Sequence, residues 1–203
     1  MERRFTPSAT ANIEEREDGK RALSGVAAVF YRKGDADTEY QLARNVFERI
    51  DRAAFDEALG RGDDTRALFN HDPNHLLGRT AAGTLRLEVS DDGLRYDIDL
   101  PSTSTGSDVA ESVKRGDLTG SSFAFTVERA DWIEEDGRDV RVIKSVRLFD
   151  VGPVTYPAYE GTSTALRSDG DASEAMASLE EHRRIASRSR MAKVSRARAL
   201  EIS

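Results

Sequence analysis

Three kinds of side chain in this sequence could together support hydrolysis by a serine nucleophile. His71 follows the short apolar run TRALFN, Ser121 and Ser122 follow Gly120, and Asp150 lies near the end of a stretch of alternating apolar residues. A neutral imidazole is the usual general base for a hydroxyl group, and a carboxylate can orient that imidazole. The 203-residue chain has no cysteine, which removes a thiolate nucleophile, disulfides and thiolate metal sites from consideration.

The alternation of residues separates the two adjacent serines. If a strand begins by residue 121, Ser121 shares a face with Phe123 and Phe125. Ser122 then shares the opposite face with the smaller Ala124, where a substrate has room. The stretch also resembles the nucleophile elbow G-x-S-x-G, but that elbow leads into a helix, and these residues predict a strand. An α/β-hydrolase is therefore a poor fit, and Ser122 is the better nucleophile.

Asp150 falls on a face that the pattern predicts to be buried. In DVRVIKSVRLFDV, valines and a leucine alternate onto one side, and Asp150 lies on that side. Burying an unpaired carboxylate is costly, so Asp150 needs a partner. The sequence leaves three partners open: an arginine, a backbone amide or His71. Only the last gives Asp150 a catalytic role.

The segment HDPNH, residues 71–75, superficially resembles the zinc-protease motif H-E-x-x-H. That motif needs both histidines on one face of a helix and a glutamate as base. Pro73 disfavours such a helix, and Asp72 is shorter than glutamate. We therefore expect no metal site, and a metallopeptidase that uses His71 and His75 is kept as an alternative. The simplest structural role for His71 is that of a polar residue at a strand end.

The elements that must position these residues are mostly strands. An alternating pattern with the turn DDG predicts a hairpin over residues 84–101, and a second hairpin turns at EEDG between strands over 122–130 and 139–151. Helices are predicted from Asp51 to Leu59 and within residues 102–116, where glycines follow the helical patterns. Further strands are expected over 24–32, 43–50 and 65–70. This predicts an α+β fold, a β-barrel or strongly curved, mostly antiparallel sheet with surrounding helices.

Composition and charge narrow the class of protein. The chain has room for one ordinary domain plus tails. A formal net charge of -7 argues against nucleic-acid binding, which needs a basic face. Apolar runs are too short to span a membrane, and the charged start has no hydrophobic signal region. We expect a soluble protein that is not secreted by the usual route and binds no membrane.

The ends of the chain differ in character from its middle. Residues 1–20 are polar and lack periodicity, which predicts a flexible N-terminal arm before a domain over 21–166. Residues 167–203 predict a linker followed by a basic, partly helical tail, because positions 182–200 hold seven Lys or Arg and no acid.

The segments FNHDPNHLLGRT, GDLTGSSFAF and LFDVGPVTYPAY, in this order, resemble the phage prohead proteases of the HK97 type. The resemblance covers about residues 21–166. It implies the fold of herpesvirus assembly proteases, with a β-barrel core and surrounding helices. It also implies a serine protease that cleaves capsid and scaffold precursors, and itself, during prohead maturation.

Carried over by position, the resemblance makes Ser122 the nucleophile and His71 the base. Asp150 is the third member, although glutamate is commoner there, and His75 stands where the family varies. The family requires no cofactor or metal. The implied partners are the major capsid protein, scaffold precursors and further copies of the chain, inside the assembling prohead in the cytoplasm of the bacterial host. A non-catalytic capsid-assembly or scaffolding module is the alternative from another class.

Overall fold

A computed structural model describes residues 1–6, 11–17, 19–155 and 171–201. The chain divides into two compact units, Met1–Leu166 and Arg167–Ser203. The last residues of the segment LFDVGPVTYPAY, after Thr155, lie outside the described residues, as do residues 167–170 of the predicted linker.

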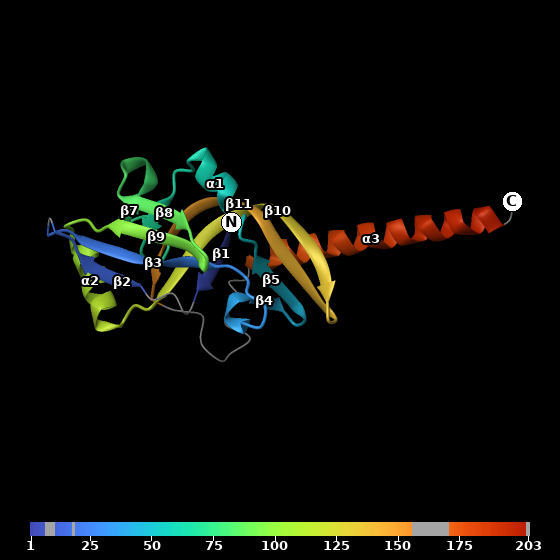
Figure 1. Cartoon of the computed structure of the whole chain (residues 1–203), viewed down its shortest axis with the longest axis horizontal. Coiled ribbons are helices and arrows are strands. Elements are labelled where there is room, and N and C mark those ends of the chain that lie inside the picture. The colour runs from blue at the N-terminus through green and yellow to red at the C-terminus, as the bar shows by residue number, and fades with distance from the viewer. Residues whose placement is uncertain (7–10, 18, 156–170, 202–203) are drawn as a thin grey trace. The chain divides into compact units, whose positions relative to one another are not determined.

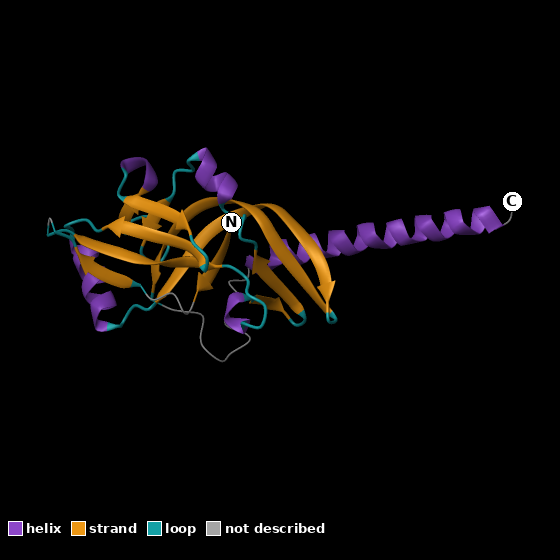
Figure 2. Ribbon diagram, in the orientation of Figure 1, coloured by secondary structure: helices purple, strands orange, loops and turns teal. Residues whose placement is uncertain are grey.

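The first unit contains two sheets and few helices (Figures 1 and 2). Within the described residues, the larger sheet has the order β1 (Glu2–Thr6), β10 (Gly120–Glu135), β11 (Arg138–Val154), β5 (Val46–Ile50) and β4 (Tyr40–Ala43), with β6 (Arg66–Leu68) on β11 and β7 (Leu76–Arg79) on β6. The smaller sheet has the order β2 (Asn12–Glu15), β3 (Arg21–Val29), β9 (Gly93–Asp99) and β8 (Leu85–Val89). The predicted α+β class is confirmed.

The larger sheet is curved and open. Its two end strands, β1 and β4, do not pair with each other within the described residues, so the barrel alternative is corrected to two open sheets. Register shifts between β10 and β11, which mark bulges, accompany the bend of these long strands (Figure 1). Pairing is antiparallel except where β11 meets β5 and β6, in agreement with a mostly antiparallel arrangement.

The predicted hairpins form as β8 with β9 and β10 with β11. Asp136 and Gly137 both adopt positive φ, as a tight two-residue hairpin turn requires. Helix α2 (Ser104–Arg115) begins where the side chain of Thr103 accepts a hydrogen bond from the amide of Gly106, and it ends at the left-handed Gly116.

Helix α1 (Asp56–Arg61) begins later than predicted. Asp51 is not its N-cap, because the Asp51 side chain accepts hydrogen bonds from the amide of Ala53 and from Lys144, which build a turn. Two short 3-10 helices, η1 (Ala36–Thr38) and η2 (Thr80–Ala82), complete the unit.

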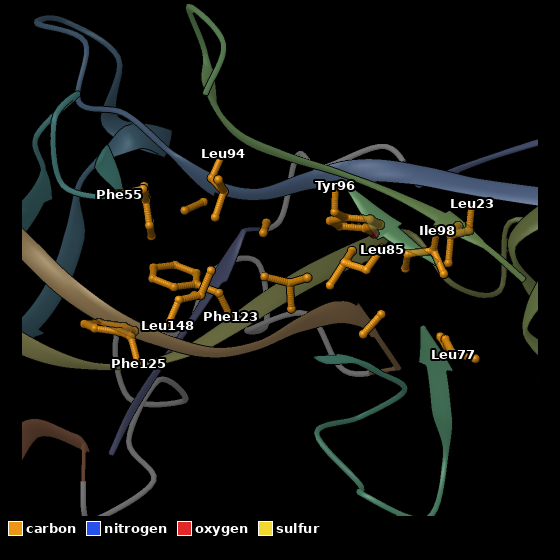
Figure 3. Close-up of a cluster of buried hydrophobic side chains, with 14 of the residues drawn as sticks. Leu23, Phe55, Leu77, Leu85, Leu94, Tyr96, Ile98, Phe123, Phe125 and Leu148 are labelled. Atoms are coloured by element: carbon orange, nitrogen blue, oxygen red, sulfur yellow. The ribbon is translucent and has the colours of Figure 1, made fainter. Parts of the chain in front are cut away.

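The hydrophobic core lies between the two sheets (Figure 3). Leu94, Tyr96 and Ile98 of β9 face it from the smaller sheet, and Phe123 and Phe125 of β10 from the larger one. The two phenylalanine rings stack with centroids 4.7 Å apart. Burying a phenylalanine side chain stabilises a fold by about 1.5–3 kcal/mol, so this packing anchors the strand segment that follows Ser122.

The N-terminal residues differ from the predicted flexible arm. Strand β1 pairs with β10, and β2 pairs with β3. In β1, Glu2 and Arg4 are buried together with Phe5 and Thr6. The charges of Glu2 and Arg4 do not fit the pattern of a buried strand, and the partners that bury them, Glu48 and Arg141, lie far away in the sequence.

The second unit contains helix α3 (Asp171–Glu201), a single helix of 31 residues. Among the described residues, no helix has both the length and the apolar character that crossing a membrane requires.

Candidate active site

Ser122 lies near the start of β10, where its neighbours are fixed on both sides. It stands opposite Gly152 of β11 and opposite Phe5 of β1. The adjacent Ser121 has its hydroxyl 2.8 Å from the Tyr96 hydroxyl and is fully buried. The strand alternation therefore separates the two serines as the sequence predicts, with Ser121 in the core.

His71 lies in the turn after β6, three residues beyond the last strand residue, Leu68. Its backbone conformation is unusual. Asn70 and His71 both have positive φ, 55° and 57°. Asparagine tolerates this left-handed region better than most residues, but two in succession need support. The Asn70 side chain donates to Thr155 Oγ1 and accepts from the Thr155 amide, both at 2.8 Å, and the Asn70 amide donates to the Pro153 carbonyl. These bonds tie the histidine turn to the end of β11.

Asp150 lies on β11, between β10, which carries Ser122, and β6, which leads into the turn with His71. It is opposite Ala124 of β10 on one side and Arg66 of β6 on the other. Gly152 allows β6 to come this close, since a Cβ there would lie 2.1 Å from the Leu68 carbonyl oxygen. Three adjacent strands, β10, β11 and β6, thus bring together residues that are far apart in the sequence.

The three predicted residues form an unbroken chain of contacts. His71 Nδ1 lies 2.5 Å from Asp150 Oδ1, and His71 Nε2 lies 2.7 Å from Ser122 Oγ. Ser122 and Asp150 are buried, and only 8% of the His71 side chain is exposed. With the imidazole proton on Nδ1 donated to Asp150, Nε2 is free to accept the serine proton. The arrangement can generate an activated serine nucleophile.

His75 does not join this group. It lies on the exposed side of the turn, where its ring packs near Phe69 and Nδ1 lies 3.7 Å from Asp72. Across the residues that the structure describes, no three His, Cys, Asp or Glu side chains are placed to hold a metal ion. Both ring nitrogens of His71 already have partners in Asp150 and Ser122.

Sequence reasoning missed three residues of this site. Asn70 and Gly152 shape the backbone around His71 and Asp150. Arg4 lies beside Ser122, with its carbonyl oxygen 2.8 Å from Ser122 Oγ. Asn70 carries a local signal, since an asparagine before a loop is typical of a left-handed position. Arg4 carries none, because the polar residues around it lack periodicity and predict a flexible arm.

Ser121→Ala is expected to reduce stability by about 1–3 kcal/mol, because it leaves the buried Tyr96 hydroxyl without its partner. Burial, partly offset by the hydrogen bond with Ser121, raises the pKa of Tyr96 to about 12, so the hydroxyl stays neutral. Urea denaturation measures the loss. The control is the double variant with Tyr96→Phe, which removes both polar partners and should recover part of the stability. An unchanged urea midpoint in the single variant would contradict the structural role of Ser121.

A hydrogen-bonded Ser, His and Asp at the strands of an α+β fold is typical of serine hydrolases. A family model described as caudovirus prohead serine protease matches residues 9–176, and the chain belongs to this family. It is thus a serine protease of phage capsid maturation. Among solved structures, the bacteriophage T4 capsid assembly protease matches with a TM-score of 0.46 and 11% sequence identity, over 76% of this chain and 99% of that one. No curated protein matches the chain significantly.

Proposed function

We propose that this chain is a serine endopeptidase whose nucleophile is Ser122, with His71 as general base and Asp150 as the residue that orients His71. Its substrates are capsid and scaffold precursors in the maturing prohead. The observation that carries the proposal is the chain of contacts Asp150, His71 and Ser122, at 2.5 and 2.7 Å.

The reaction is acyl transfer. Ser122 Oγ attacks the scissile carbonyl while His71 Nε2 takes its proton, and the protonated imidazole is stabilised by the Asp150 carboxylate. His71 then returns the proton to the leaving amine. Water repeats the attack on the acyl-enzyme, with His71 again as base, and frees Ser122.

We assign the enzyme to the HK97 type of prohead protease, with the fold relationship to herpesvirus assembly proteases that this implies. It acts inside the assembling prohead, in the cytoplasm of the bacterial host, and needs no cofactor. Its partners are the major capsid protein, the scaffold precursors and further copies of itself.

Co-expression with the major capsid protein tests the proposal against its two alternatives. We expect the capsid precursor to be shortened by the wild-type protein and not by Ser122→Ala. A scaffolding module would leave the precursor intact in both. A metallopeptidase using His71 and His75 would lose activity with a chelator and keep it with a serine-directed fluorophosphonate, the opposite of our expectation.

The C-terminal region provides a prediction about self-processing. If the enzyme trims its own tail, purified wild-type protein should lose the region after Arg167, whereas Ser122→Ala should keep it. The seven basic residues at positions 182–200 would otherwise remain to bind capsid or scaffold subunits. Intact-mass spectrometry of the two proteins, prepared in parallel, measures the difference. Equal masses of wild type and Ser122→Ala, after the difference of one oxygen, would contradict trimming by Ser122.

A further inference from the structure

Strand β1 lies directly beside the nucleophile. It runs antiparallel to the first residues of β10, with Phe5 opposite Ser122 and Thr6 opposite Ser121. The Arg4 carbonyl oxygen accepts a hydrogen bond from Ser122 Oγ at 2.8 Å. A polypeptide substrate must likewise present a peptide carbonyl within about 3–3.5 Å of the serine hydroxyl.

The same contact competes with the general base. Ser122 Oγ is within hydrogen-bond distance of both the Arg4 carbonyl and His71 Nε2, but a hydroxyl has only one proton to donate. When that proton is donated to the Arg4 carbonyl, it is not directed toward the imidazole. Strand β1 therefore opposes activation of Ser122 in addition to occupying space beside it.

The arrangement of strands gives a substrate one edge of β10 to pair with. β11 occupies the other edge, with Gly152 opposite Ser122 and Asp150 opposite Ala124. Extended peptides often bind by adding a strand to a free sheet edge. A substrate that pairs with β10 at Ser122 must therefore take the place of β1.

A buried cluster of four charges holds β1 in place. From β1, Arg4 Nε donates to Glu48 of β5 at 2.5 Å, and Glu2 accepts from Arg141 of β11 at 3.0 and 3.1 Å. Burial lowers the pKa of the Arg4 guanidinium, but its ion pairs with Glu48 and Glu2 outweigh this and raise the pKa above its usual value. Arg4 is therefore charged in place.

This cluster divides into two neutral halves. Within β1, Arg4 Nη2 lies 2.7 Å from Glu2 Oε2. Outside β1, Arg141 Nη1 lies 3.1 Å from Glu48 Oε2. Breaking a buried ion pair is most costly when it leaves one charge uncompensated. Departure of β1 removes one acid and one base together, and the two that remain already contact each other. The cluster can thus hold β1 firmly and still release it.

We propose that β1 is a substrate-like strand that keeps the protease latent, and that the edge of β10 over residues 120–125 binds the extended polypeptide substrate once β1 leaves. The inference rests on the proposed role of Ser122. It goes further by assigning the substrate-binding edge and its resident inhibitor.

A reversible lock on β1 tests this directly. Arg3 lies directly opposite Ala124 in the pairing of β1 with β10, and residues opposite each other in an antiparallel pair are spaced suitably for a disulfide. The natural chain has no cysteine that could form a competing disulfide. The double variant Arg3→Cys/Ala124→Cys should cleave purified capsid precursor at least about 100-fold more slowly when oxidised than after reduction, because the locked edge leaves little competent enzyme. Equal rates in the oxidised and reduced forms would overturn the proposal.

Two controls separate the lock from other effects. The single variants Arg3→Cys and Ala124→Cys, given the same oxidant, report any cost of the substitutions alone. The double variant Glu88→Cys/Arg95→Cys places a disulfide between facing, exposed residues of β8 and β9, and its rate should not depend on oxidation. The comparison of wild type with Ser122→Ala tests the proposed function, and the disulfide variant tests the role of β1. If wild type cleaves the precursor and Ser122→Ala does not, the proposed function stands even when the disulfide has no effect.

A second measurement uses the wild-type chain. Acetyl-Glu-Arg-Arg boronic acid copies residues 2–4 and should inhibit by reacting with Ser122. In the inhibited protein, hydrogen exchange should become faster at the amides of residues 3–6 and stay slow at residues 120–125. Lack of inhibition would contradict the substrate-like placement of β1, and continued protection of residues 3–6 would contradict its departure.

Discussion

Ser122→Ala is expected to lower the rate of capsid-precursor cleavage by about a million-fold, to the level without the enzyme nucleophile. In the proposed mechanism the Ser122 hydroxyl oxygen attacks the scissile carbonyl. The neighbouring Ser121 cannot replace it, because its own hydroxyl points into the core and contacts Tyr96. Quantitative gel analysis of purified precursor and enzyme measures the rate.

The fold should survive this substitution. Ser122 loses only its contacts with His71 and the Arg4 carbonyl, and alanine is accepted readily in a strand between β1 and β11. Circular dichroism and a thermal melt serve as the check. Ser121→Ala is the matched control, since it alters the neighbouring serine, costs stability and should retain cleavage. Substantial cleavage by folded Ser122→Ala, or its loss only in Ser121→Ala, would reject the assignment of the nucleophile.

Asp150→Asn should reduce kcat by about 10,000-fold with little change in KM. Asparagine has nearly the same shape, so the strand pairing of β11 is preserved. Its amide group can donate toward His71 Nδ1, which places the imidazole proton on Nε2, where it can no longer accept the proton of Ser122. A steady-state assay with a peptide from the capsid cleavage site separates kcat from KM.

Asp72→Asn is the matched control for this variant. Asp72 is the residue next to His71, but its side chain accepts hydrogen bonds from Asn74 and lies in the exposed turn. The same change of carboxylate to amide at that position should leave kcat within a few fold. A fully active Asp150→Asn enzyme would show that His71 needs no carboxylate and that Asp150 is structural.

Local patterns predicted much of the structure because the responsible forces act between near neighbours in the chain. The alternation after Gly120 placed Ser121 and Ser122 on opposite faces, and the hairpins and helix α2 follow from alternation, turn glycines and a Thr103 cap. The predicted start of α1 at Asp51 was wrong, because the Asp51 side chain contacts Lys144, which is distant in the sequence.

The N-terminus shows where such reasoning ends. In the sequence, Glu2 and Arg4 are expected to be solvated charges. In the fold they are buried, because Glu48 and Arg141 form ion pairs with them. The open sheet has a similar origin, since strand order depends on long-range pairing that no local pattern encodes.

The sequence by itself determined the kinds of residue available for catalysis, the choice of Ser122 over Ser121, and the resemblance to prohead proteases. It left the partner of Asp150 open between an arginine, a backbone amide and His71. Only the tertiary structure decided that question, because β6 pairs with β11 and β11 with β10, which places Asp150 2.5 Å from His71 and His71 2.7 Å from Ser122. Pairing between distant strands also placed β1 beside Ser122.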